Sequence, residues 1–295
     1  MAQKINRAIE LLAGAQAIYY TGAHSGHVLT HAQGMKDAHT WADYINIGME
    51  HGAFDMAGLA QYMQGLVDGG PTRSGHPTPA VIVEAPVNGL DEVSVRTNAW
   101  QFRQILARGV HGILLCQAES AAATRAFVAN CRFSHHKLPP ASSNPSNGMR
   151  GRGSESTAAP IWGLDPEDYI RRADPWPLNP EGELLLGVKI ESPQGVANCE
   201  EILAVPGLGF AELGPGDLSL SLGYVSIPPE PYPHEMREAR ARVFAATRAN
   251  KLAFLEGCTP DNIAARIDEG VRIVAGGREE TARIGRRHQR RQMPV

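Results

Sequence analysis

Two acidic side chains follow neighbouring apolar segments in the middle of the chain. Glu191 lies in Lys-Ile-Glu-Ser-Pro (189–193) and Asp217 in Gly-Pro-Gly-Asp-Leu-Ser (214–219). The preceding apolar runs, 184–190 and 208–213, are typical of buried strands, and a helical stretch over 195–203 separates them. Neighbouring parallel strands lie about 4.8 Å apart, so both carboxylates could bind one cation. Oxygen ligands favour Mg²⁺ or Mn²⁺ with open positions for water or substrate. The alternative is that both side chains cap the helices that follow.

A histidine stands at the corresponding place after an earlier strand. His51 lies in Met-Glu-His-Gly-Ala-Phe-Asp (49–55), directly after the apolar run 44–49. On that side of a parallel sheet it would act as a general base near neutral pH, directly or through a metal-bound water. The neighbouring Glu50 is expected to point to the other side of the strand end. The alternative is a strand-end histidine that only bonds the backbone.

The elements that would position these residues alternate along the whole chain, which predicts one α/β domain over residues 1–295. Predicted strands cover 17–20, 44–49, 80–84, 112–116, 184–190, 209–213, 252–255 and 271–275. Predicted helices cover 56–67, 99–107, 120–130, 195–203, 235–249, 261–269 and 279–290. Eight strands with interleaved helices indicate a (β/α)₈ TIM barrel. A doubly wound sheet is the alternative, but no convincing glycine-rich phosphate turn follows the first strand.

An insertion around 134–183 interrupts this alternation. It contains two long loops, 134–157 and 174–183, and the second includes Asp-Pro-Trp-Pro-Leu-Asn-Pro, in which the prolines exclude a helix. Long loops in a compact domain are commonly functional. Because both precede the fifth strand, we expect them to cover the carboxyl end of the barrel, beside the active site.

Composition excludes several classes of protein. The net charge of −3 gives no general attraction to nucleic acid, and no run of 18 apolar residues predicts a membrane span. The four cysteines lack metal-ligand spacing, and the amino terminus lacks a signal peptide, which favours the cytoplasm.

The basic stretch 283–292 is interpreted as a solvated or subunit-contacting helix. His24, His27 and His31 have a spacing compatible with zinc, but the glycines among them favour a loop, and contact with substrate from that loop is a further alternative.

The motifs taken together resemble the HpcH/HpaI family, the metal-dependent class II pyruvate aldolases. The resemblance rests on Glu-His-x-x-x-Asp (50–55), Ile-Glu-Ser (190–192) and Gly-Pro-x-Asp-Leu-Ser (214–219). It extends to Gly-Met-Arg-Gly (148–151) and to the proline-rich loop 173–180, typical of one branch of the family. It covers roughly residues 40 to 280, nearly the whole chain.

This resemblance implies a barrel that cleaves a 4-hydroxy-2-oxo acid to pyruvate and an aldehyde, or catalyses the reverse addition. It implies that Glu191 and Asp217 bind Mg²⁺, Mn²⁺ or Co²⁺, and that His51 takes the proton of the 4-hydroxyl group. Gly214 and Pro215 would shape the turn that contacts the substrate carboxylate, and Arg150 would also bind substrate. A homo-oligomer, a hexamer by analogy, is implied, with the last helix packed on a neighbouring barrel.

Three positions depart from the family pattern. Glu84, in Val-Glu-Ala-Pro (83–86), replaces the arginine of Val-Arg-x-Pro, and Gly48 replaces an acidic partner of the histidine. Cys-Gln-Ala (116–118) replaces Pro-His-Val, which makes Gln117 a predicted substrate contact. Glu84 is predicted to bind a cationic or hydroxylated substrate, to add a metal ligand or to be the acid/base. The alternatives to an aldolase are therefore a decarboxylase, a hydratase, a condensing enzyme or a non-catalytic oxo-acid-binding protein.

Overall fold

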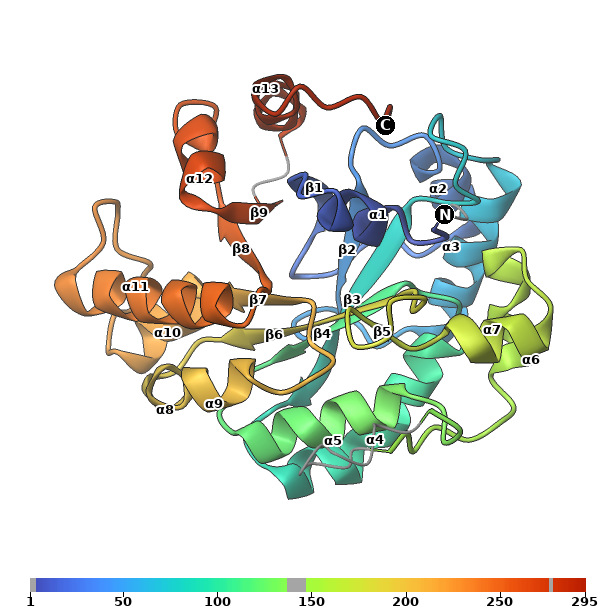
Figure 1. Cartoon of the computed structure of the whole chain (residues 1–295), viewed down its shortest axis with the longest axis horizontal. Helices are drawn as coiled ribbons and strands as arrows, with labels where there is room; N and C mark the ends of the chain where they lie inside the picture. Colours follow the sequence, from blue (N-terminus) through green and yellow to red (C-terminus); the bar gives the residue numbers. More distant parts are fainter. Residues whose placement is uncertain (1–3, 137–146, 276–277) are drawn as a thin grey trace.

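A closed barrel of eight parallel strands forms the centre of the molecule, and helices surround it (Figure 1). The computed structural model describes residues 4–136, 147–275 and 278–295. Its strands are β1 (Ile18–Ala23), β2 (Tyr44–Gly48), β3 (Ala80–Asn88), β4 (Gly112–Cys116), β6 (Leu184–Ile190), β7 (Phe210–Leu213), β8 (Ala253–Gly257) and β9 (Val271–Ala275). The pairing of β4 with β6 closes the sheet, and the short β5 (Pro175–Trp176) adds to β6. The TIM-barrel prediction and all eight predicted strands are confirmed.

The helices follow the strands in the predicted order, with several additions. They are α1 (Arg7–Ala13), α2 (His31–Asp37), α3 (Met56–Asp68), α4 (Glu92–Leu106), α5 (Ala121–Cys131), α6 (Glu155–Ala158), η1 (Pro160–Trp162), α7 (Pro166–Arg172), α8 (Pro193–Ala197), α9 (Cys199–Leu203), α10 (Pro215–Ser221), α11 (His234–Ala249), α12 (Ile263–Glu269) and α13 (Glu279–His288). The helix predicted over 99–107 begins earlier, because Asp91 caps it by accepting the Ser94 N–H. In the described part of the chain, no helix combines the length and apolarity that crossing a membrane requires.

The strands alternate between two apolar clusters, as the two-residue period of a strand requires. One cluster lies between the barrel and its helices, and the other fills the barrel interior. Tyr20 and Tyr44 are neighbours in register inside the barrel, with ring centroids 5.0 Å apart. Helix α1 packs Ile9 and Leu11 against this interior cluster and so closes the amino end of the barrel.

The described part of the insertion lies at this amino end. Residues 174–183 lead directly into the start of β6, where β5 pairs with it. Lys4 Nζ donates to the Pro180 carbonyl at 2.6 Å, and the Asn6 N–H donates to Glu183 Oε2 at 2.9 Å. The expectation that both loops cover the carboxyl end is therefore wrong for the described residues, because α5 already returns the chain to the amino end, where Phe133 pairs with Arg150. In the loop 134–157, residues 137–146 lie outside the described residues.

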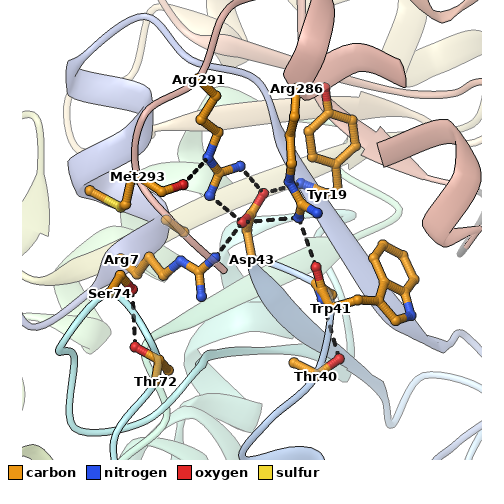
Figure 2. Close-up of polar contacts among 12 residues, drawn as sticks. Arg7, Tyr19, Thr40, Trp41, Asp43, Thr72, Ser74, Arg286, Arg291 and Met293 are labelled. Carbon is orange, nitrogen blue, oxygen red and sulfur yellow. Dashed lines mark hydrogen bonds and ion pairs between the residues drawn. The ribbon is translucent and has the colours of Figure 1, made fainter. Parts of the chain in front are cut away.

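A buried aspartate connects the C-terminal segment to the same end (Figure 2). Asp43, fully buried just before β2, accepts hydrogen bonds from Arg7 Nη2 at 2.9 Å, Arg286 Nη2 at 3.2 Å and Arg291 Nη1 at 2.7 Å. Burial alone would raise the pKa of Asp43, but the three guanidinium groups, Arg291 foremost, hold it below its usual value. Part of the basic C-terminal stretch therefore serves an internal ion cluster, and the predicted subunit contact of α13 stays a prediction.

Candidate active site

A pocket of about 530 Å³ opens at the carboxyl end of the barrel, above the charged layer of its interior. It is lined by His24, His51, Lys189, Glu191, Glu212, Gly214, Pro215, Gly216, Asp217, Ser219, Leu220, Val225, Ser226 and Ile227. The strand ends and the loops that follow β1, β2, β6 and β7 supply these residues. Carboxyl-end loops are where barrel enzymes hold their active sites. Five of the predicted site residues, His51, Glu191, Gly214, Pro215 and Asp217, therefore meet in one pocket.

The first unpredicted residue is Lys189, which points into the barrel from β6. Its side chain is 5% exposed, and its Nζ lies 2.8 Å from Glu50 Oε2, 3.5 Å from Glu84 Oε2 and 4.0 Å from Glu191 Oε2. Burial alone would lower the pKa of Lys189, but the surrounding acidic groups outweigh burial and raise it. Lys189 is thus an ammonium group held among carboxylates. The sequence signal was available, because residues 189 and 191 of one strand share a face.

Glu50 lies on the opposite side from the one expected. Its side chain is 7% exposed and bonds Lys189, and its Oε2 is 3.6 Å from His51 Nε2. The expectation that Glu50 points away is wrong, because it continues the inward series that Asn46 and Gly48 begin on β2. His51, half-exposed on the turn beyond the strand, reaches the pocket through that turn instead. Glu50 therefore stands beside the histidine, although the family's acidic partner position is Gly48.

Glu84 is enclosed by donors and does not line the pocket. Its side chain is 1% exposed, and its Oε1 accepts from Asn46 Nδ2 and from His24 Nδ1, both at 2.6 Å. Burial acts to raise the pKa of Glu84, but His24 and Lys189 lower it overall, and the bond to Glu84 raises the pKa of His24. Glu84 is consequently a carboxylate whose hydrogen bonds are made to other side chains of the protein. Of its three predicted roles, direct acid/base chemistry and substrate contact gain no support from this position.

Acidic groups near His51 form a possible metal site. Ligand atoms of Glu50, His51 and Asp217 lie within 4.8 Å of one another, and His51 Nε2 is 3.8 Å from Asp217 Oδ2. A second group, Glu50, Glu84 and Cys116, meets the same distance limit. Lys189 already bonds Glu50 and Glu84 there, and burial raises the pKa of the Cys116 thiol, so it is a poor ligand. Carboxylate and imidazole donors fit a divalent ion with open positions, so the first group fits this chemistry better.

Glu191 lines the same pocket but belongs to neither of these groups. Its Oε1 accepts the Gln117 backbone N–H at 2.8 Å, and Gln117 has the left-handed φ of 51° that aims this N–H. Burial raises the pKa of Glu191 to about 9, Lys189 acts to lower it and Glu50 to raise it further. A bound cation would favour the ionised form. Gly214 is needed here, because a Cβ would lie 2.3 Å from Glu191 Oε2.

The remaining predicted substrate contacts have different positions. Gln117 meets the site through its backbone, as described above. Arg150 pairs with Phe133 just beyond the carboxyl end of α5, at the amino end of the barrel, and its Nη2 donates to Ser154 Oγ at 2.8 Å and to the Tyr169 hydroxyl at 3.0 Å. It is 1% exposed and lies over the Phe133 ring. This position gives its predicted substrate role no support and indicates a packing role.

Glu212 and His24 complete the charged interior. Sequence reasoning missed Glu212, whereas His24 belongs to the loop for which a substrate contact was considered. Glu212 of β7 is the register partner of Lys189, and its Oε2 has no hydrogen-bond partner among the described residues. Burial, the largest influence, raises the pKa of Glu212 to about 7. His24 lies in the loop after β1, as predicted, whereas His31 begins α2, which Thr30 caps. His27 pairs with Asp37 and His31 with Asp68, so the three histidines do not form a zinc site together.

Comparisons with known proteins agree with this arrangement. The family model described as HpcH/HpaI aldolase/citrate lyase matches residues 79–284. A hydroxypyruvate/pyruvate aldolase of Delftia acidovorans is 32% identical over 176 residues, 59% of this chain and 57% of that protein. The match thus spans little more than half of that relative. A hydroxypyruvate/pyruvate aldolase of Roseobacter denitrificans is 27% identical over 233 residues, 79% of this chain and 76% of that protein. The crystal structure of a family protein from Burkholderia cenocepacia shares the fold, with a TM-score of 0.68, 20% identity and 96% of both chains covered.

Proposed function

Because the chain belongs to the HpcH/HpaI aldolase/citrate lyase family, we propose that it is a divalent-metal-dependent carbon–carbon lyase. It cleaves or forms a 4-hydroxy-2-oxo acid, with pyruvate or a related 2-oxo acid as the enolate donor. The observation that carries this proposal is one pocket at the carboxyl end of the barrel, lined by His51, Glu191 and Asp217. The aldolase names of the Delftia and Roseobacter relatives support the same reaction class.

The cation would be held by Glu191 and Asp217, which both line the pocket. Glu50 lies beside Asp217 and His51, whose ligand atoms form a close group with its own. When bound, Mg²⁺, Mn²⁺ or Co²⁺ supplies Lewis-acid stabilisation of negative charge on a substrate oxygen. Asp217 lies in the first turn of α10, where the helix dipole also favours negative charge. The protein groups therefore provide both the anionic ligands and a fixed place for an oxo acid.

In the cleavage direction, His51 takes the proton of the 4-hydroxyl group on Nε2, directly or through a water. The C4–O bond becomes a carbonyl, the C3–C4 bond breaks, and its electron pair forms the enolate of the 2-oxo acid. The imidazolium returns its proton to C3, directly or through water, which yields pyruvate or its relative. Glu50 Oε2 lies 3.6 Å from His51 Nε2, beside the imidazole that carries the proton between these steps.

The turn before α10 orients the substrate carboxylate. The Gly214 N–H donates to the Ile190 carbonyl at 3.0 Å, and Pro215 has no N–H, so neither supplies the contact itself. They shape the turn, and the free N–H groups are those of Gly216 and Asp217, since the first N–H groups of a helix lack intrahelical partners.

A direct assay tests the proposal. The purified protein is incubated with Mg²⁺ or Mn²⁺, pyruvate and a panel of aldehydes, and loss of pyruvate is followed together with formation of the adduct. We expect turnover that EDTA abolishes and that Asp217→Asn reduces at least tenfold. Oxaloacetate loss with no aldol product would favour the decarboxylase instead, a reaction that needs no aldehyde. Tight binding of oxo acids without turnover would overturn the enzymatic proposal.

Oligomeric state and compartment are part of the same proposal. The family resemblance supports a homo-oligomer, with a hexamer as the specific expectation. Size-exclusion chromatography with light scattering measures the molar mass and tests this expectation. The four cysteines are all free and buried, which supports a reducing compartment such as the cytoplasm.

A further inference from the structure

The pocket contains one permanently cationic side chain among acidic ones. Lys189 is the only lysine or arginine that lines it in the part of the chain that the structure describes. The ionisable side chains around it are two histidines and the carboxyl groups of Glu191, Glu212 and Asp217. A lysine in this position has a use that the metal chemistry proposed above does not include.

The surrounding carboxylates hold the ammonium group in place without using all of its donors. An ammonium has three N–H groups. Glu50 Oε2 accepts one at 2.8 Å, and Glu84 Oε2, at 3.5 Å, accepts a second at the limit of hydrogen bonding. Glu191 Oε2, at 4.0 Å, is within ion-pair range but not bonded. Two of the three N–H groups thus have acceptors among the described residues, and Lys189 lines the pocket, where a ligand can accept the third.

The partners of Glu84 show how this lysine is fixed. Asn46 and His24 each bind Glu84 Oε1 at 2.6 Å, which leaves Oε2 for the lysine. The two strands that carry Glu84 and Lys189 are held in register by β4, which pairs with both. Glu84 thus acts as a counter-ion that positions Lys189 and does not meet the substrate.

A 2-oxo acid brings negative charge to this acidic pocket. Its carboxylate is an anion, and carbon–carbon cleavage places a second negative charge on the 2-oxo oxygen. Resting on the function proposed above, we propose that Lys189 Nζ donates a hydrogen bond to the 2-oxo oxygen and stabilises the enolate. A fixed donor aimed at developing charge in a buried site is a strong catalytic device. Lys189 is then a catalytic residue, and Glu50 and Glu84 are positioning residues.

The test compares charge-removing and charge-retaining variants. Lys189→Met removes the charge at similar length, Lys189→Arg keeps it, and Lys36→Met on the exposed face of α2 is the matched control. The first readout is the affinity of oxalate, a planar dianion that resembles the enolate, for the Mn²⁺-loaded protein by calorimetry. The second is metal-dependent exchange of the pyruvate methyl protons in D₂O, followed by NMR.

We expect Lys189→Met to weaken the binding of oxalate at least about tenfold, because a lost hydrogen bond to a charged group has about this effect. Its exchange kcat should fall about 10²- to 10³-fold, as for removal of one donor from an oxyanion site, with a smaller change in pyruvate KM. Lys189→Arg keeps a cationic donor and should therefore lose less than Lys189→Met in both readouts. Lys36→Met should match the unaltered chain.

Three results would overturn the proposal. The first is a folded Lys189→Met protein with oxalate affinity and exchange kcat within threefold of the unaltered chain. The second is inactivation by borohydride in the presence of pyruvate, which would show an imine on the lysine. The third is equal loss of affinity for oxalate and for pyruvate, which would indicate a structural role. If Lys189→Met does not fold, Glu84→Gln/Lys189→Met removes both charges of the pair and gives the same comparison against Glu84→Gln alone.

Failure of the proposed function gives a different pattern. An unaltered chain that binds Mn²⁺ but exchanges no methyl protons of pyruvate and cleaves no 2-oxo acid overturns the lyase. In that case oxalate binding still tests whether Lys189 contacts an oxygen of an oxo acid. Affinity that disappears with Lys189→Met and survives in Lys189→Arg supports the contact with an oxo-acid oxygen, whereas unchanged affinity overturns it.

Discussion

Replacement of Asp43 by asparagine should destabilise the protein strongly without touching the pocket. Asp43 is the shared counter-ion of Arg7, Arg286 and Arg291, and the exposed fractions of the Arg7 and Arg291 side chains are 1% and 2% (Figure 2). The substitution keeps the shape but leaves three guanidinium groups close together with no carboxylate. Removal of one partner from a buried ion pair costs about 3–5 kcal/mol. With about 2.1 cal/mol/K per residue, 295 residues give an unfolding entropy of about 620 cal/mol/K, so 4 kcal/mol lowers Tm by about 6 °C.

Thermal melts followed by circular dichroism measure this shift. The matched control is Asp261→Asn, an exposed aspartate, for which we expect a change in Tm under about 1 °C. The double variant Asp43→Asn/Arg291→Met should be more stable than Asp43→Asn alone, since it removes one of the uncompensated charges. A fall in Tm under about 2 °C for Asp43→Asn, or no recovery in the double variant, would refute the argument that this carboxylate holds the C-terminal segment.

Three further predictions concern the mouth and the core of the barrel. Glu50→Gln should weaken Mn²⁺ binding about 10- to 100-fold in calorimetry, whereas Glu84→Gln, which also loses a lysine partner, should change it less than about threefold; equal losses would contradict a role for Glu50 beside the cation. Burial lowers the pKa of His111 to about 3, so its contribution to stability is present above pH 6.5 and falls as the unfolded state takes up a proton. Urea unfolding should show about 3 kcal/mol less stability at pH 4.5 from this source, and His111→Asn should remove that part of the pH dependence, while an unchanged slope would refute it. Gly48→Ala should lower both Tm and activity, because its Cβ would lie 1.9 Å from the His24 carbonyl oxygen; an unaltered Tm would show that the two loops separate freely.

The orientation of the strand-end residues shows where reasoning from sequence stopped short. The apolar runs were long enough to identify all eight strands, and their acidic ends pointed to one face of the barrel. On β2 every second side chain points into the barrel, and Glu50 continues this series, contrary to expectation. His51 reaches the pocket through the turn that follows the strand. The alternation of inward and outward side chains along a strand can be read from the sequence, as Asn46 and Gly48 show. The path of the residues beyond the last hydrogen bond of the strand cannot be read in this way.

The insertion gives a second example, in which the place of a loop follows from the helix before it. The helix predicted over 120–130 forms as α5 and returns the chain to the amino end of the barrel. The short helices α6 and α7 follow there, and residues 174–183 meet the start of α1 at the same end. Arg150, expected at the substrate, lies at the same end and packs over the Phe133 ring.

By itself, the order of residues determined the (β/α)₈ class, the strand ends that carry Glu191 and Asp217, and the family, because strand periodicity and short motifs are local properties of the chain. Only the closed barrel decided that Lys189 from β6, Glu84 from β3 and Glu50 from the end of β2 would meet. Closure through the β4–β6 pairing brings together side chains more than a hundred residues apart, and their charges acquire a partner only once that ring is complete.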